Sequence, residues 1–181
     1  MGRMIIDAAT SLDGFWADAR GRSVMRASDL HGSGLSGRLG DVCGAVVMSR
    51  RSFDLSGDPS WIGEAYAAQT PVFVVTDTPI ASVPANGPPG LRFLGSYADA
   101  FAAARQAADD RAVLVVGEAS ALKAAMRTGE ADEIWLRMTA RTLGRGSALF
   151  EDGIPVENYF VSEMETTSDA VHMHLEKRIG A

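Results

Sequence analysis

Three short valine-rich runs constrain the fold of this chain more than any other feature of its sequence. They occupy residues 45–48, 71–76 and 112–116, and apolar side chains dominate each run without alternating with polar ones. Such continuous runs are typical of parallel strands covered on both faces, whereas a half-exposed strand alternates apolar and polar residues. The sequence therefore predicts a mostly parallel sheet covered on both sides.

The segments around these runs predict the remaining elements. Alanine-rich and amphipathic patterns predict helices at residues 97–108 and 119–127. Further strands are predicted at residues 4–9 and 134–139, and a closing antiparallel hairpin at 159–167 and 170–178 with Asp169 in its turn. Residues 10–40 and the proline-rich residues 79–90 are expected to be loops. No repeat or linker divides the sequence, so residues 1–181 are predicted to form one α/β domain with a mixed sheet.

Charge and cysteine content limit the partners that we expect. The chain has 181 residues and a net charge of −6, and binding to nucleic acid or to acidic membranes requires a basic face instead. Cys43 is the one cysteine, so no internal disulfide forms and a reducing cytoplasm suits the chain. We expect Cys43 to be a buried filler and not a nucleophile. Neither a signal-peptide pattern nor an apolar run of roughly 18 residues is present, and we expect a cytoplasmic location without membrane association.

The end of the first valine-rich run carries an unusual group of polar residues. Residues 46–53 read Val-Val-Met-Ser-Arg-Arg-Ser-Phe, so an apolar strand runs directly into a small residue, two arginines and a hydroxyl. A helix that starts there directs unpaired N–H groups beyond the strand, and the guanidiniums of Arg50 and Arg51 favour phosphate. The alternative is an arginine-rich helix start on the surface.

Other strand ends place small or hydroxyl residues at the same edge of the predicted sheet. They are Ala9-Thr10, Thr76-Asp77 and Gly117-Glu118-Ala119-Ser120. Ligands of open α/β sheets bind beyond the carboxyl ends of the parallel strands, so these residues and the arginines predict a nucleotide pocket across the sheet. The Gly-x-Gly-x-x-Gly fingerprint of dinucleotide-binding folds is not present.

Two motifs resemble a known family when they are taken with the order of the strands. Residues 11–14 read Ser-Leu-Asp-Gly, and residues 143–150 read Leu-Gly-Arg-Gly-Ser-Ala-Leu-Phe. The chain resembles the dihydrofolate-reductase-like superfamily over nearly its whole length. Within it, the chain is most similar to the reductase domain at the C-terminus of bifunctional riboflavin-biosynthesis deaminase/reductases. The resemblance implies a three-layer α/β sandwich with a mostly parallel central sheet and a C-terminal antiparallel hairpin.

The resemblance also implies an activity and a cofactor. The implied protein is an NADPH-dependent reductase that transfers a hydride to a small heterocyclic substrate, such as a pterin-like or ribosylamino-pyrimidine-like molecule. The Ala9 backbone would hold the nicotinamide carboxamide, and Thr76 would contact the adenosine end. The resemblance implies that the cofactor phosphates contact Ser49, Arg50, Arg51 and Ser52, and that the pyrophosphate contacts Gly117, Glu118, Ala119, Ser120 and Leu122.

The chain departs from the family pattern where the cofactor would bind. Glu118 stands where the family usually has a second glycine, and Ser49 replaces a common glycine before the arginines. Asp77 adds a carboxylate near the implied adenosine end. Like charges facing a phosphate cost about 1 kcal/mol or more each, unless Glu118 is paired with Arg50 or Arg51. The alternative function is therefore a non-catalytic nucleotide- or ligand-binding relative with weakened cofactor binding.

Few residues are candidates for the chemistry itself. Hydride transfer needs no nucleophile, only a positioned cofactor and a donor or water that supplies a proton. Asp13 is a candidate donor, although an aspartate before Gly14 more often fixes a turn. His31 is a second candidate, with a surface-loop role as its alternative. Trp16, Ser23 and Met25 border the substrate side in this interpretation, with plain packing as the alternative for Trp16.

Two further expectations concern metals and assembly. His172 and His174 alternate along the last predicted strand, but two imidazoles without a matching carboxylate do not make a metal site, and we expect none. The closing hairpin carries more apolar residues than a polar outer face needs, namely Phe160, Val171, Met173 and Leu175. An uncovered sheet edge is prone to aggregation, so a symmetric homodimer through these strands is expected.

Overall fold

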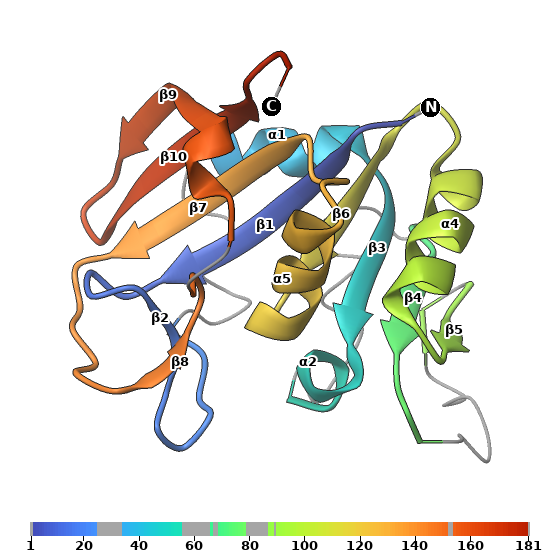
Figure 1. Ribbon diagram of the computed structural model, residues 1–181, viewed down its shortest axis with the longest axis horizontal. Coiled ribbons are helices and arrows are strands. Elements are labelled where there is room, and N and C mark those ends of the chain that lie inside the picture. Colours follow the sequence, from blue (N-terminus) through green and yellow to red (C-terminus); the bar gives the residue numbers. More distant parts are fainter. Residues whose placement is uncertain are drawn as a thin grey trace.

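A computed structural model describes residues 2–24, 34–55, 66, 69–78, 87–88, 90–151 and 154–180. Its centre is an eight-stranded sheet (Figure 1). In spatial order its strands are β5 (Arg92–Leu94), β4 (Val72–Val75), β3 (Cys43–Ser49), β6 (Ala112–Val116), β1 (Met4–Thr10), β7 (Glu133–Thr139), β10 (Ala170–Lys177) and β9 (Tyr159–Thr166). The first six run parallel to one another, and β10 is antiparallel to both β7 and β9.

Helices cover both faces of this sheet. The helices are α1 (Gly34–Val42), α2 (Arg50–Leu55), α4 (Tyr97–Ala108) and α5 (Ala119–Arg127). Helices α4 and α5 lie on the near face in Figure 1 and bury Phe101 and Leu122 in one core cluster. Leu39 of α1 belongs to a second cluster on the opposite face, together with Ile5 and Val46. Two cores separated by a mostly parallel sheet make three layers, which confirms the predicted fold class.

Helix α4 shows how the sequence produces this packing. Ser96 caps its N-terminus, because the Ser96 hydroxyl accepts a hydrogen bond from the Asp99 N–H at 3.1 Å. The alanines of its buried face let the helix approach β3 closely, and a Cβ at Gly44 would lie 2.8 Å from the Ala108 Cβ. Glycine at position 44 therefore permits the contact between helix and sheet.

Most predicted elements occur where the patterns place them, and the differences have a physical reason. Helices α4 and α5 and strand β6 have the predicted bounds. The segment 10–40, expected to be loops, contains β2 (Phe15–Asp18) and most of α1, and β2 pairs with β8 (Gly146–Ala148) in a small second sheet. Glycines weaken the helical signal of α1, and β2 and β8 are too short to show a period. Both are stabilised by tertiary contacts. Among the described helices, none is both long and apolar enough to span a membrane.

The C-terminal hairpin ends the sheet as predicted, but its exposed apolar residues differ from the expected set. Met173 and Leu175 of β10 are half-buried and pack against the main core cluster, so they stabilise the fold of the chain itself. Within the two strands of the hairpin, the exposed large apolar side chains lie on the edge strand β9, where Phe160 of the expected set is 39%, Val161 52% and Met164 63% exposed. An interface would therefore use β9 in place of Met173.

Candidate functional site

The parallel strands bring four distant segments to one edge of the sheet. Strand β6 is parallel to both β1 and β3, and β3 is parallel to β4, so their carboxyl ends point the same way. This edge lies at the bottom of Figure 1, where β3 leads into α2 and α5 begins. Thr10, Ser49, Thr76 and Gly117 thus lie along one rim, as the strand-end pattern predicts.

The ends of β3 and β6 contact each other through Ser52. The Ser52 hydroxyl accepts a hydrogen bond from the Glu118 N–H at 2.8 Å, and the Ser49 hydroxyl lies 3.2 Å from it. Gly117 has a φ of 94°, and a Cβ there would collide with the Ser52 side chain. Only glycine allows both this left-handed backbone and this close approach. We call Ser49, Ser52, Gly117 and Glu118 the Ser52 cluster.

Each arginine beside the Ser52 cluster has a carboxylate partner. The Arg50 Nε lies 2.7 Å from Asp54 Oδ1, and the Arg51 guanidinium lies 3.6 Å from Glu118 Oε2. Glu118 also accepts a hydrogen bond from the Ser120 hydroxyl at 3.0 Å, and its side chain is only 14% exposed. The carboxylate that departs from the family pattern is therefore paired with Arg51, one of the two arrangements that would offset its charge.

The other implied cofactor residues are divided between the rim and the core. Ala9 is buried in β1, and the Thr76 hydroxyl accepts a hydrogen bond from the Thr78 N–H at 3.2 Å on the rim. Ser120 lies 2.8 Å from the Tyr97 hydroxyl. The side chains of Ala119 and Leu122 are buried in the main core, so they are not free to contact a ligand.

Asp13 holds two loops together. Its carboxylate accepts hydrogen bonds from the Ser11 hydroxyl at 2.5 Å and from the Gly144 N–H at 2.7 Å, and it also accepts from the Leu143 N–H. These donors lower the pKa of Asp13 to about 2, with the Ser11 hydroxyl as the largest cause. A carboxylate that is ionised at neutral pH and accepts from three groups has no proton to donate. The geometry therefore favours the turn-fixing role of Asp13 over a proton donor.

The residues expected on the substrate side have different environments. Trp16 is only 5% exposed and belongs to the main core cluster, which favours packing over a ligand wall. Ser23 forms an antiparallel bridge with Ala17 at the end of the β2 turn. Met25 and His31 lie outside the described residues. Among the residues that the structure describes, no three potential metal ligands lie together.

A buried ion pair beneath this rim was not predicted from the sequence. Arg137 of β7 donates a hydrogen bond to Asp7 Oδ1 of the neighbouring β1, and the Tyr66 hydroxyl donates to Asp7 Oδ2 at 3.1 Å. Both charged side chains are at most 5% exposed. Burial alone would lower the pKa of Arg137, but the Asp7 charge and hydrogen bond raise it above its usual value. A charged residue in the middle of each apolar strand, Asp7 in β1 and Arg137 in β7, is the signal that could have revealed this pair.

Comparison with solved structures places the chain in a known fold. A protein from Shewanella sp. PV-4, provisionally assigned to riboflavin biosynthesis, aligns with a TM-score of 0.75 and 23% identity over 97% of this chain and 99% of that one. A diaminohydroxyphosphoribosylaminopyrimidine deaminase/5-amino-6-(5-phosphoribosylamino)uracil reductase from Thermotoga maritima aligns with a TM-score of 0.70 and 15% identity. That alignment covers 97% of this chain and 56% of that one.

Dihydrofolate reductase from Enterococcus faecalis, solved in complex with NADP(H) and RAB-propyl, aligns with a TM-score of 0.68 and 13% identity. That alignment covers 97% of this chain and 96% of the reductase. No family model and no curated protein matches the sequence. The three structures share one architecture, and this chain has the dihydrofolate-reductase-like fold.

Proposed function

We propose that this chain is an NADPH-dependent reductase of a small heterocyclic substrate, pterin-like or ribosylamino-pyrimidine-like. The observation that carries the proposal is the Ser52 cluster, where Gly117 closes against Ser52 at the carboxyl edge of a dihydrofolate-reductase-like sheet. Two solved proteins with this fold are reductases by description, and one of them was solved with NADP(H). A single domain of residues 1–181 in the cytoplasm is part of the same proposal.

The side chains at this rim suit the phosphates of a dinucleotide. Arg50 and Arg51 are about half exposed, so a phosphate can contact their guanidiniums without unfolding any element. Backbone and hydroxyl groups of the Ser52 cluster add neutral donors, and glycine at position 117 keeps side-chain atoms out of the space between the loops. Thr76 would bind the adenosine end and the Ala9 backbone the nicotinamide amide.

NADPH, when bound, supplies the hydride. The chain's own contribution would be position: residues at the carboxyl end of β1 would hold the nicotinamide ring, and the turn that Asp13 fixes would shape the neighbouring wall. Because Asp13 is ionised at neutral pH, the proton that complements the hydride would come from water or from another donor.

The alternative, a ligand-binding relative with weakened cofactor affinity, is favoured by one observation. Arg50 and Arg51 each face a carboxylate, Asp54 and Glu118, so the four charges cancel locally. A phosphate must then compete with two existing ion pairs. Exposed ion pairs of this kind contribute only about 0–1 kcal/mol each, and we therefore expect the competition to weaken cofactor binding without abolishing it.

Titration with NADPH and NADH, followed by tryptophan fluorescence, tests the proposal. Arg50→Ala/Arg51→Ala should raise the NADPH dissociation constant roughly 100-fold, from about 1.5 kcal/mol for each charge-assisted contact. Arg127→Ala/Arg141→Ala, which removes the same charge from exposed positions, is the matched control. Binding of neither nucleotide at millimolar concentration would reject the reductase, and equal affinities of the two folded variants would reject the phosphate role of Arg50 and Arg51.

A further inference from the structure

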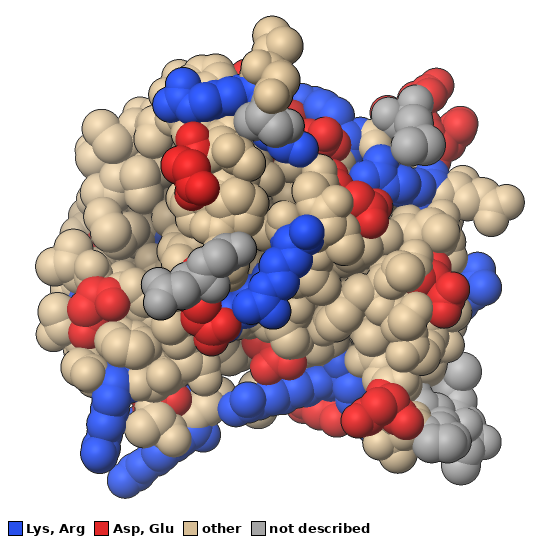
Figure 2. All heavy atoms as spheres, in the orientation of Figure 1, with Lys and Arg blue, Asp and Glu red and all other residues tan. Residues whose placement is uncertain are grey.

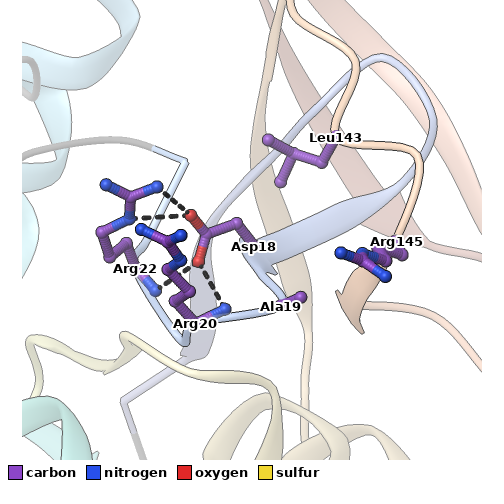
Figure 3. Close-up of a pocket in the computed structure, with 6 residues that line it drawn as sticks. All are labelled: Asp18, Ala19, Arg20, Arg22, Leu143 and Arg145. Atoms are coloured by element: carbon purple, nitrogen blue, oxygen red, sulfur yellow. Dashed lines mark hydrogen bonds and ion pairs between the residues drawn. The ribbon is translucent and has the colours of Figure 1, made fainter.

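A second basic site, made of other side chains, lies beside the Ser52 cluster. A pocket of about 310 Å³ lies between the turn after β2 and the loop before β8 (Figure 3). The residues that line it, which we call the arginine pocket, are Asp18, Ala19, Arg20, Arg22, Leu143 and Arg145. Three arginines and one aspartate leave this small volume with a local charge of +2, on a chain whose net charge is −6.

One wall of the arginine pocket is a tight turn closed by Asp18. The Asp18 carboxylate accepts hydrogen bonds from the backbone N–H of Arg20 at 2.9 Å and of Arg22 at 3.0 Å. It also accepts from the Arg22 Nε at 2.8 Å, as Figure 3 shows. Backbone and side-chain bonds from Arg22 hold the pKa of Asp18 below its usual range. Asp18 is therefore ionised and fixes the turn together with the Arg22 guanidinium.

The opposite wall is also held in place. Asp13 binds the N–H groups of Leu143 and Gly144. Gly146 pairs with Asp18, and a Cβ at Gly146 would collide with the Ala17 carbonyl, so this glycine lets β8 approach β2 closely. Arg145 lies between these two anchored points in the sequence and lines the pocket on the side of this loop (Figure 3). Preorganised walls reduce the ordering cost of binding a ligand.

Two of the three guanidiniums in the arginine pocket are available to bind an anion. Arg22 is paired with Asp18, whereas Arg20 and Arg145 have no carboxylate partner among the described residues, and both are exposed. Figure 2 shows extended basic side chains projecting at the lower left edge of the molecule, where Figure 1 places β2 and β8. Arg20 and Arg145 line the same pocket from its two walls without a carboxylate partner among the described residues, so both guanidiniums can receive an anion from outside.

We propose that the arginine pocket binds a doubly charged anionic group, a phosphate or a dicarboxylate, of a small-molecule ligand. The charge of such a group matches the local charge of +2, and planar guanidiniums bind oxygen pairs of either group in bidentate fashion. The volume is at the lower end of the range for small-molecule sites. A Cβ added at Gly21 of the same turn would collide with the Arg51 guanidinium, so the pocket adjoins the Ser52 cluster while using other side chains.

Inorganic phosphate and malonate, titrated at low ionic strength, test this site. The titrations use the Arg50→Ala/Arg51→Ala variant, which removes the other arginine pair, so the result does not depend on cofactor binding. Calorimetry should show saturable binding of at least one probe, and the amide resonances of Gly21 and Gly144 should shift. The tighter probe identifies the anionic group as phosphate or dicarboxylate.

The decisive comparison adds Arg20→Ala/Arg145→Ala to that background. Affinity should fall about tenfold, since two exposed charge-assisted contacts are lost, whereas added Arg127→Ala/Arg141→Ala should leave it unchanged. Both pairs are exposed, so all variants should fold. No saturable binding of either probe below about 10 mM, or an equal fall in both variants, would overturn the proposal.

Discussion

The buried pair of Asp7 and Arg137 offers the sharpest test of how the sheet beneath the site is stabilised. Arg137→Met keeps most of the side-chain volume but removes the charge. Asp7 is then a buried carboxylate to which, among the described residues, only the Tyr66 hydroxyl still donates. Removing one partner of a buried ion pair costs about 3–5 kcal/mol, because the other charge is left uncompensated. The melting temperature should fall by roughly 10 °C, at about 2–4 °C per kcal/mol for a domain of this size.

The double variant Asp7→Leu/Arg137→Met tests whether the cost of Arg137→Met comes from the buried charge that it leaves unpaired. Apolar replacement of both partners removes the unpaired charge, and a buried pair replaced in this way is often neutral or stabilising. The Tyr66 hydroxyl loses its acceptor, which costs about 1 kcal/mol. We therefore expect the free energy of unfolding of the double variant to lie within about 2 kcal/mol of the wild-type value. The loss should be much smaller than the sum of the losses in Asp7→Leu and Arg137→Met.

Urea denaturation followed by circular dichroism measures these free energies of unfolding. Arg38→Met is the matched control, because Arg38 pairs with Glu163 at 2.5 Å on the surface, with both side chains about half exposed. Arg38→Met should lower the free energy of unfolding by less than about 1 kcal/mol. An Arg137→Met cost no larger than that of Arg38→Met, or additive single effects in the double variant, would refute the reasoning.

Three further predictions follow from the site and the sheet edge. Glu118→Gly should tighten NADPH binding a few-fold by freeing Arg51, worth about 0.5–1 kcal/mol, and weaker binding in a fluorescence titration would mean that Glu118 organises the pocket. Asp13→Asn should lower the melting temperature at pH 7, because the pKa of Asp13 is about 2 when folded and its stabilisation is complete above its ordinary value of 3.8. The difference from wild type should shrink below about pH 4 as that stabilisation is lost toward pH 2, and a pH-independent difference would contradict the role of its charge. We expect a homodimer through β9 that Met164→Glu converts to a monomer, and light scattering that finds the wild type at 19.1 kDa at micromolar concentration would contradict it.

Local patterns predicted the elements that carry their own signal. The valine-rich run at residues 112–116 is β6, and the alanine-rich pattern is α4 with the predicted bounds. Burial on both faces leaves a continuous apolar run in the sequence, and burial on one face leaves a helical period. The carboxyl ends of β1, β3 and β6 could also be placed at one edge, since parallel strands must share it. The fold class and the rim of the candidate site were therefore available from the sequence.

Other features depend on partners that are far away in the chain. The partner of Glu118 is Arg51 and that of Asp7 is Arg137, and neither choice can be read from spacing. The arginine pocket likewise joins the turn at Arg20 to a loop more than 120 residues later at Arg145. An ion pair forms between whichever charges the packing brings within a few ångströms, so only the tertiary structure decides it.

The sequence by itself determined the layers, the strand directions and the position of the rim, because hydrophobic periodicity and turn chemistry are local properties of the chain. Only the tertiary structure decided which charges meet, that Asp13 holds the loop at Gly144, and that Trp16 is part of the core. Those outcomes rest on distances between segments remote in sequence, which periodicity does not encode.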